Sequence, residues 1–280
     1  HLKTAIELKP GLINTRYFLG LTHLMNGKAK LAENSLLQTL QIQPAHYGAS
    51  LLICELLYKK KEYKLSVRYL EKFLKMYPND TSGYVLYGLN LLELSDYTGA
   101  EKQFMKAATH VTSKRYVVKY YLGISYEKQK KYRKALFQYE DVLKQHPELL
   151  DVSYRYSLML IKTGQKKKAR QFMVQALLTQ PRSPELHLFF SKAAEYMKDV
   201  KKQEELLKKA IDLSGANGVI YIELSKLYKR QKQFQKSVSI LRECTQKLPD
   251  FEDGWIALSQ SYINAEDIQS ALEIMEEGFD

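Results

Sequence analysis

Proline recurs along this chain at a fixed spacing of 34 residues. Pro10, Pro44 and Pro78 are one such period apart, as are Pro147 and Pro181, and Pro249 lies two periods after Pro181. A fixed period between about 20 and 50 residues is typical of repeat architectures, in which each repeat packs only on its neighbours. The spacing therefore predicts an array without a single central core, whose function lies in an extended surface.

The period gives the repeats a common numbering, with the proline at position 32. It divides the chain into a partial repeat and eight further repeats, at 1–12, 13–46, 47–80, 81–115, 116–149, 150–183, 184–217, 218–251 and 252–280. Thr112 and Gly215 stand at position 32 in two repeats. Because the pattern begins and ends inside a repeat, we expect the sequence to be a segment of a longer protein.

Small and large side chains alternate in fixed columns of the repeat. Small residues recur at position 8 and, except for Gln203, at position 20, while large apolar residues recur at positions 7 and 24. Positions 4, 7, 8 and 11 share one helical face, and so do positions 20, 24 and 27. Each repeat is thus predicted to hold two amphipathic helices, A and B, with aromatic residues at position 17 marking the start of helix B and proline ending it.

This pattern resembles the tetratricopeptide repeat, whose signature combines a Leu-Gly-x2-Tyr core, a small residue, an aromatic residue and a proline. The fourth repeat shows that signature at Leu122, Gly123, Tyr126, Ala135, Tyr139 and Pro147. The resemblance covers nearly the whole chain. It implies an all-α fold, a single right-handed solenoid of about eight helix-turn-helix repeats over residues 1–280.

Motifs for catalysis, metal binding or nucleotide binding are missing from the sequence. It contains no G-x-x-x-x-G-K-[ST], G-x-G-x-x-G, H-E-x-x-H or C-x-x-C. His23 and His187 fall in helix columns and are expected to pack, and Cys54 and Cys244, five repeats apart, are expected to be buried and unpaired. We therefore expect no catalytic residue, no metal, no cofactor and no small-molecule substrate. No apolar run reaches the ~18 residues that a membrane span needs.

The resemblance implies that positions 2, 5, 9, 12 and 13 of helix A line a concave groove. Position 5 is apolar or aromatic in all eight repeats. Position 9 is apolar in the first five repeats except at Glu55, and it is charged or polar at Lys192, Lys226 and Gln260. An apolar groove suits an amphipathic helix or an extended hydrophobic segment of a partner. A tightly wound solenoid could instead bury these side chains between neighbouring A helices. The predicted groove residues are Tyr17, Leu21, Leu51, Tyr58, Val85, Leu89, Tyr120, Ile124, Tyr154, Leu158 and Leu188.

A second candidate surface is basic. The net charge is +12, although residues 250–280 hold nine acidic residues and neither Lys nor Arg. Basic residues gather near the turns between helices A and B, and their common phase is expected to align them along one edge. Such an edge would attract acidic partners, or would serve solubility alone. It comprises Lys59, Lys60, Lys61, Lys128, Lys130, Lys131, Lys166, Lys167, Lys168, Lys201, Lys202, Lys229 and Arg230.

The sequence therefore favours a protein-interaction scaffold that holds a peptide or helix of a partner protein in its apolar groove. Two alternatives stay open: a basic edge that docks on an acidic protein, polysaccharide, membrane or nucleic acid, and a targeting arm of an enzyme whose catalytic domain lies elsewhere. Nucleic acid is the least favoured of these partners, because no aromatic–basic motif of a known reader occurs. Self-association is compatible with the pattern, and so are a cytoplasmic and a bacterial-envelope location.

Overall fold

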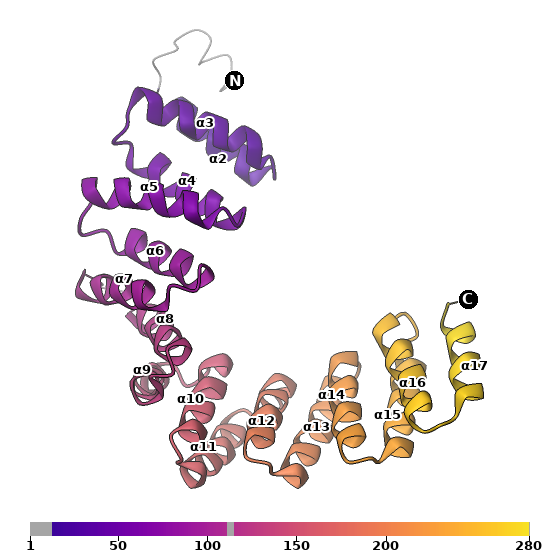
Figure 1. Cartoon of the computed structure of the whole chain (residues 1–280). Coiled ribbons are helices and arrows are strands. Elements are labelled where there is room, and N and C mark those ends of the chain that lie inside the picture. The colour runs from indigo at the N-terminus through magenta and orange to yellow at the C-terminus, as the bar shows by residue number, and fades with distance from the viewer. Residues whose placement is uncertain (1–12, 111–114, 280) are drawn as a thin grey trace. The chain divides into compact units, whose positions relative to one another are not determined.

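The computed structural model describes residues 13–110 and 115–279, and over these ranges the chain is all-α, with sixteen helices and no strand (Figure 1). In each repeat the even-numbered helix is helix A, and the odd-numbered helix that follows it is helix B. The A helices are α2 (Ile13–Met25), α4 (Tyr47–Lys59), α6 (Thr81–Glu93), α8 (Arg115–Lys128), α10 (Leu150–Lys162), α12 (Pro184–Tyr196), α14 (Gly218–Arg230) and α16 (Glu252–Asn264). The B helices are α3 (Ala29–Ile42), α5 (Tyr63–Met76), α7 (Tyr97–His110), α9 (Tyr132–Gln145), α11 (Lys166–Thr179), α13 (Val200–Ser214), α15 (Phe234–Lys247) and α17 (Ile268–Phe279).

The helix boundaries fall at regular positions of the repeat numbering. All eight B helices begin at position 17, where Tyr63, Tyr97, Tyr132 and Phe234 supply the expected aromatic residue. In every described repeat that has the proline, helix B ends two residues before it. The helix α13 has no such proline and is one residue longer, ending at Ser214 because Gly215 adopts a φ of 68°. Pro10, Thr112 and the partial repeat 1–12 lie outside the described residues.

Contacts divide the chain into two compact units, residues 1–146 and 147–280, called the N-terminal and C-terminal units below. In the N-terminal unit each A helix packs on its own B helix, and each B helix packs on the next A helix. The C-terminal unit repeats this arrangement from α12 onward. At its start the arrangement differs, because α12 packs mainly on the A helix α10 and only weakly on the B helix α11. The prediction of one solenoid through both units stays a prediction.

The small-residue columns lie in the interface between helices A and B. Every residue at positions 8 and 20 is buried, including Gln203, which is 4% exposed and donates a hydrogen bond from its Nε2 to Glu195. Some polar members bond to backbone groups: the Ser66 hydroxyl donates to the carbonyl oxygen of Cys54 at 2.9 Å, across the two helices. The Ser237 hydroxyl instead lies 3.0 Å from that of Ser261. Since these side chains are short, the two helix backbones approach closely along their length.

The residue at position 8 is matched to the one at position 24. Phe104 and Tyr139 are the two aromatic residues at position 24, and each faces a glycine. A Cβ atom at Gly88 would lie 2.5 Å from Cε1 of Phe104, and one at Gly123 would lie 2.5 Å from Cε1 of Tyr139. Where Leu or Met stands at position 24, serine or cysteine is accommodated opposite it in five of six repeats. The ring thus occupies the volume that a larger residue at position 8 would need.

The turn between helices A and B imposes a strained backbone at position 15. All eight residues there have positive φ, and only Gly27 and Gly164 are glycine. The other six, such as Lys61 and Lys130 at φ of 62° and 60°, each cost roughly 1 kcal/mol relative to the right-handed region. Four of these six residues are lysines.

The match between Gly88 and Phe104 predicts coupled substitutions. Gly88→Ala is expected to lower the free energy of unfolding by about 1–3 kcal/mol, because the new methyl group overlaps the phenyl ring. Phe104→Leu should remove most of that overlap, so the double variant should be more stable than the sum of the single effects implies. Urea unfolding followed by circular dichroism measures the cycle; strictly additive effects would contradict the proposed match.

Candidate functional site

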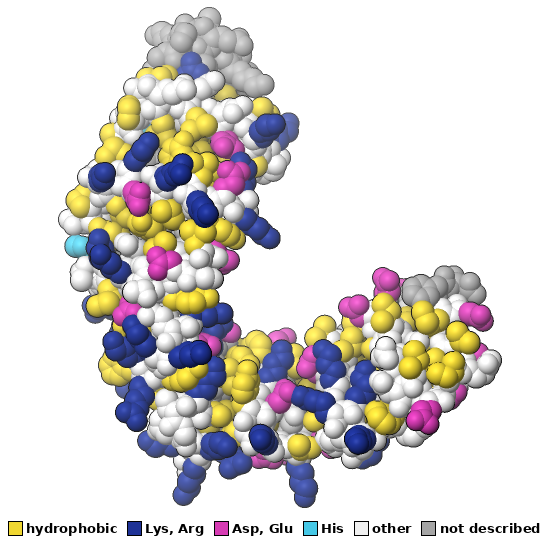
Figure 2. Space-filling model, in the orientation of Figure 1, with side chains coloured by type: hydrophobic (Ala, Val, Ile, Leu, Met, Phe, Trp, Pro, Cys, Tyr) yellow, Lys and Arg dark blue, Asp and Glu magenta, His cyan; other side chains and the backbone are white. Residues whose placement is uncertain are grey.

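The predicted groove residues of the N-terminal unit lie on its A helices and are half-buried. Tyr17, Leu21, Leu51, Tyr58, Val85, Leu89, Tyr120 and Ile124 all keep part of their surface exposed. This set is called the A-helix face of that unit. Figure 2 shows apolar side chains gathered between Lys and Arg on the side of this unit turned to the viewer.

Aromatic contacts pack the tyrosine rings of this face against their neighbours. The ring of Tyr17 lies 4.8 Å from that of His46 between centroids, and a Cβ at Gly48 would be 2.8 Å from its Cζ. Tyr58 packs near Tyr63 at 5.6 Å, and burial followed by the charge of Glu93 raises the pKa of its phenol. Such contacts fix the rings in place and leave one side of each accessible, which suits a preorganised binding surface.

In the C-terminal unit the predicted groove is partly closed. Tyr154 of α10 stacks on Phe189 of α12, with centroids 5.3 Å apart. Leu158 is only 6% exposed, because α10 and α12 pack directly on each other. Its placement on an accessible groove was therefore wrong, and it contributes to helix packing. Leu188 remains half-buried.

The basic residues do lie at the turns and are mostly exposed. Only Lys202 and Lys229 among the thirteen are half-buried. Ion pairs across repeats join Lys60 to Glu33 at 2.9 Å and Lys131 to Glu101 at 2.8 Å. Successive turns therefore lie beside one another within the N-terminal unit, and acidic residues neutralise part of the edge.

The turn before α11 has the densest unpaired positive charge of the edge. Lys166, Lys167 and Lys168 are exposed, and over residues 13–110 and 115–279 none of them forms an ion pair. Because these three side chains are exposed to solvent, salt would weaken their electrostatic interactions with a partner.

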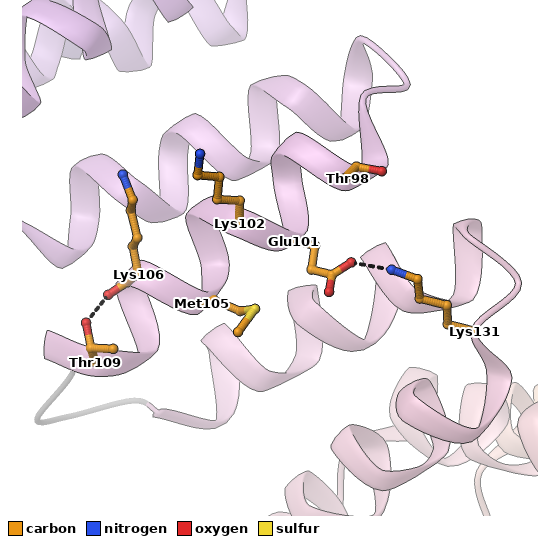
Figure 3. Close-up of a pocket in the computed structure, with 7 residues that line it drawn as sticks. All are labelled: Thr98, Glu101, Lys102, Met105, Lys106, Thr109 and Lys131. Carbon is orange, nitrogen blue, oxygen red and sulfur yellow. Dashed lines mark hydrogen bonds and ion pairs between the residues drawn. The ribbon is translucent and has the colours of Figure 1, made fainter.

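A pocket of about 460 Å³ lies on the outer side of α7 (Figure 3). Met105 forms part of its wall, and the ion pair between Glu101 and Lys131 closes one end, while Lys102 and Lys106 extend away from it. The pKa of Glu101 is lowered by its hydrogen bonds to Lys131 and Gln129, against the raising effect of burial. The ion pair between Glu101 and Lys131 joins the third repeat to the fourth beside this pocket.

The histidines have structural roles that sequence reasoning predicted only in part. His187 is 6% exposed, and its Nδ1 lies 2.8 Å from the carbonyl oxygen of Ser183, in agreement with packing. His46 is half-buried, and its Nδ1 accepts a hydrogen bond from the backbone N–H of Ala49 at the start of α4. No group of three His, Cys, Asp or Glu side chains that could hold a metal occurs in the described part of the chain.

Comparisons with known proteins agree with this geometry. A tetratricopeptide repeat family model matches residues 126–193. This match spans the fifth repeat and parts of the fourth and sixth. Curated proteins give no match to its sequence. Across the ranges that the structure describes, no helix has the length and apolarity to cross a membrane.

Three solved structures share the tetratricopeptide fold. Yeast Tom70 is 17% identical with a TM-score of 0.66, over 95% of this chain and 60% of that chain. Pseudomonas aeruginosa pilF is 20% identical with a TM-score of 0.57, over 73% of this chain and 93% of that one. YrrB, described as a TPR protein with an unusual peptide-binding site, is 16% identical with a TM-score of 0.52, over 66% of this chain and 95% of that one. Tetratricopeptide arrays are scaffolds with extended surfaces for binding other proteins.

The two cysteines of the tetratricopeptide array illustrate how its small-residue columns exclude solvent. Cys54 and Cys244 are both 0% exposed and free, as predicted. Burial raises the pKa of Cys54 to about 12 and that of Cys244 to about 11, with a smaller contribution from the neighbouring glutamates. The reactive thiolate is therefore scarce at neutral pH.

Both thiols are expected to resist modification in the folded protein. At pH 8, a disulfide reagent such as DTNB should react with neither cysteine on the timescale of its reaction with free thiol, and with both after unfolding in guanidinium chloride. The absorbance of the released thiolate measures this. Rapid reaction of the folded protein, with helicity retained, would show that a column is open to solvent.

Proposed function

We propose that this chain is a protein-interaction scaffold that binds a peptide or amphipathic helix of a partner along its A-helix face. The observation that carries the proposal is the row of half-buried apolar and aromatic side chains on successive A helices of the N-terminal unit. These side chains come from a rigid frame and keep a face exposed. Each partner side chain fully buried there would contribute about 1.5–3 kcal/mol.

The scarcity of charged side chains at positions 5 and 9 of the first repeats supports an apolar segment as the ligand. Position 5 carries no charged residue in any repeat, and position 9 carries Leu21, Leu89 and Ile124 in three of the first four repeats. A partner helix with apolar residues at i, i+3, i+4 and i+7 presents the complementary stripe. A few such anchors support micromolar binding after the cost of association.

The third repeat offers a matched pair of variants to test this surface. Leu89 of α6 belongs to the A-helix face, whereas Met105 of α7 lies on the outer pocket and is 52% exposed. Peptides would first be selected from a displayed library on the unaltered chain. Leu89→Glu is expected to weaken their binding at least about tenfold, because a charge would face the apolar side of the peptide.

Met105→Glu should leave the affinity within about twofold, since it introduces the same charge in the same repeat on the other side. Isothermal calorimetry measures both affinities, and circular dichroism checks that both variants fold. Equal binding by the Leu89→Glu variant and the unaltered chain would refute the groove, and a loss confined to Met105→Glu would move the site to the outer pocket.

A second function, docking of the basic edge on an acidic surface, is favoured by the unpaired lysines before α11. Replacing Lys166, Lys167 and Lys168 together by serine should weaken binding to an acidic surface, such as vesicles with anionic lipid or a heparin column. Binding by the unaltered chain should also fall as salt rises, because exposed charges are screened. Elution from heparin at the same salt concentration for both proteins would contradict a role for this turn.

A further inference from the structure

The C-terminal unit contains a pocket of about 400 Å³ that is lined only by charged side chains. Glu195 of α12 and Glu223, Lys226, Lys229 and Arg230 of α14 form its walls. All five come from A helices, so the pocket lies on the same side of the repeats as the predicted groove. Three cations and two carboxylates leave a formal net charge of +1.

Two of the three cations already have acidic partners. Lys226 Nζ lies 2.9 Å from Oε1 of Glu223, one helical turn away, and Arg230 pairs with Glu195 of the preceding repeat. Lys229 is different, because it forms no ion pair with any residue of 13–110 or 115–279. The positive charge of the pocket therefore resides on this one ammonium group.

Lys229 is also the cation that the fold shields most from water. Its side chain is half-buried, whereas Lys226 and Arg230 are exposed. Burial, and then the charge of Lys226, lower the pKa of Lys229 from its ordinary value. A shielded ammonium beside a second cation is unfavourable for folding unless an anion offsets it.

We propose that Lys229 and its pocket bind one acidic side chain, Asp or Glu, of a partner segment that lies along α12 and α14. A single carboxylate would balance the net charge of +1 and give Lys229 an acidic partner, which no residue of 13–110 or 115–279 supplies. A phosphate group, with about two negative charges, would meet Glu195 and Glu223 without enough cations to offset both. The pocket chemistry therefore selects a carboxylate over a phosphate.

The surroundings of the pocket fit an apolar residue next to that acidic one. Leu188 and Ile222 occupy position 5 of the same two helices, α12 and α14, and both are half-buried. The inference rests on the proposed function in one respect, namely that a partner segment lies along the A helices. Binding of a carboxylate to the pocket can nevertheless be measured without first selecting a partner. The ligand class is thus a segment with one acidic residue between apolar ones.

Three short peptides and one ion test the site directly. The main probe is acetyl-Leu-Glu-Leu-amide, whose only charge is the glutamate. Acetyl-Leu-Gln-Leu-amide removes that charge, and acetyl-Leu-Gln-Leu with a free C-terminus moves the carboxylate from the side chain to the backbone. Inorganic phosphate is the fourth probe. Binding is followed by chemical-shift changes of the backbone amides of α12 and α14 in NMR titrations of the whole chain.

The glutamate peptide is expected to give saturable shifts around Lys229, and the glutamine amide and phosphate much weaker ones. Lys229→Gln should raise the dissociation constant of the glutamate peptide about tenfold. Lys209→Gln removes the same charge from an exposed site on α13 and should change it less than about twofold. The melting temperature of the Lys229→Gln variant should be unchanged or higher, which a purely structural role of Lys229 would not produce.

Equal effects of Lys229→Gln and Lys209→Gln would overturn the proposal, since they would indicate attraction by net charge alone. Tighter binding of phosphate, or stronger binding of the free C-terminus than of the glutamate side chain, would also overturn it. These outcomes are separate from failure of the groove. If Leu89→Glu has no effect on the binding of selected peptides while Lys229→Gln weakens binding of the glutamate peptide, the pocket is supported as a carboxylate site and the apolar binding face is refuted.

Discussion

The close approach of helices A and B within each repeat is the constraint on which the rest of this structure depends. It requires a small residue at positions 8 and 20, and the backbone carbonyl of one helix can then accept a hydrogen bond from the other, as from Ser66 to Cys54. Where position 24 carries an aromatic ring, as at Phe104 and Tyr139, even serine is too large and glycine stands opposite. Because the approach recurs in every repeat, each A helix turns the same face away from its B helix.

Because the same face recurs in each repeat, the faces of successive A helices together form one extended surface within a unit. One A helix offers only two or three apolar side chains, whereas successive A helices of a unit offer a row that a partner segment can follow. The composition of the row differs between the two units: it is apolar at Leu89 and Ile124 in the N-terminal unit and charged at Lys226 and Lys229 in the C-terminal unit. The two units therefore suit segments of different chemistry, apolar for the first and acidic for the second.

Much of the architecture was predictable because the determining contacts are local. The start of helix B at Tyr63 or Tyr97 and its end before proline follow from residues a few positions away. The positive φ at Lys61 could not be predicted from its residue type, because lysine rarely adopts that region and the geometry of the turn imposes it. Leu158 was misplaced because its burial depends on how closely α10 packs on α12, and no residue pattern within one repeat reports that distance.

The sequence by itself determined the period, the two helices of each repeat and the columns that pack between them, since all of these depend on spacing along one chain segment. Only the tertiary structure decided which exposed charges are neutralised, because ion pairs such as Lys60 with Glu33 and Arg230 with Glu195 join residues from different repeats. It also decided that Lys229 is shielded and without an acidic partner, although the sequence placed it in the same basic cluster as Arg230. Burial and pairing depend on neighbours in space, and those neighbours exist only once the repeats have stacked.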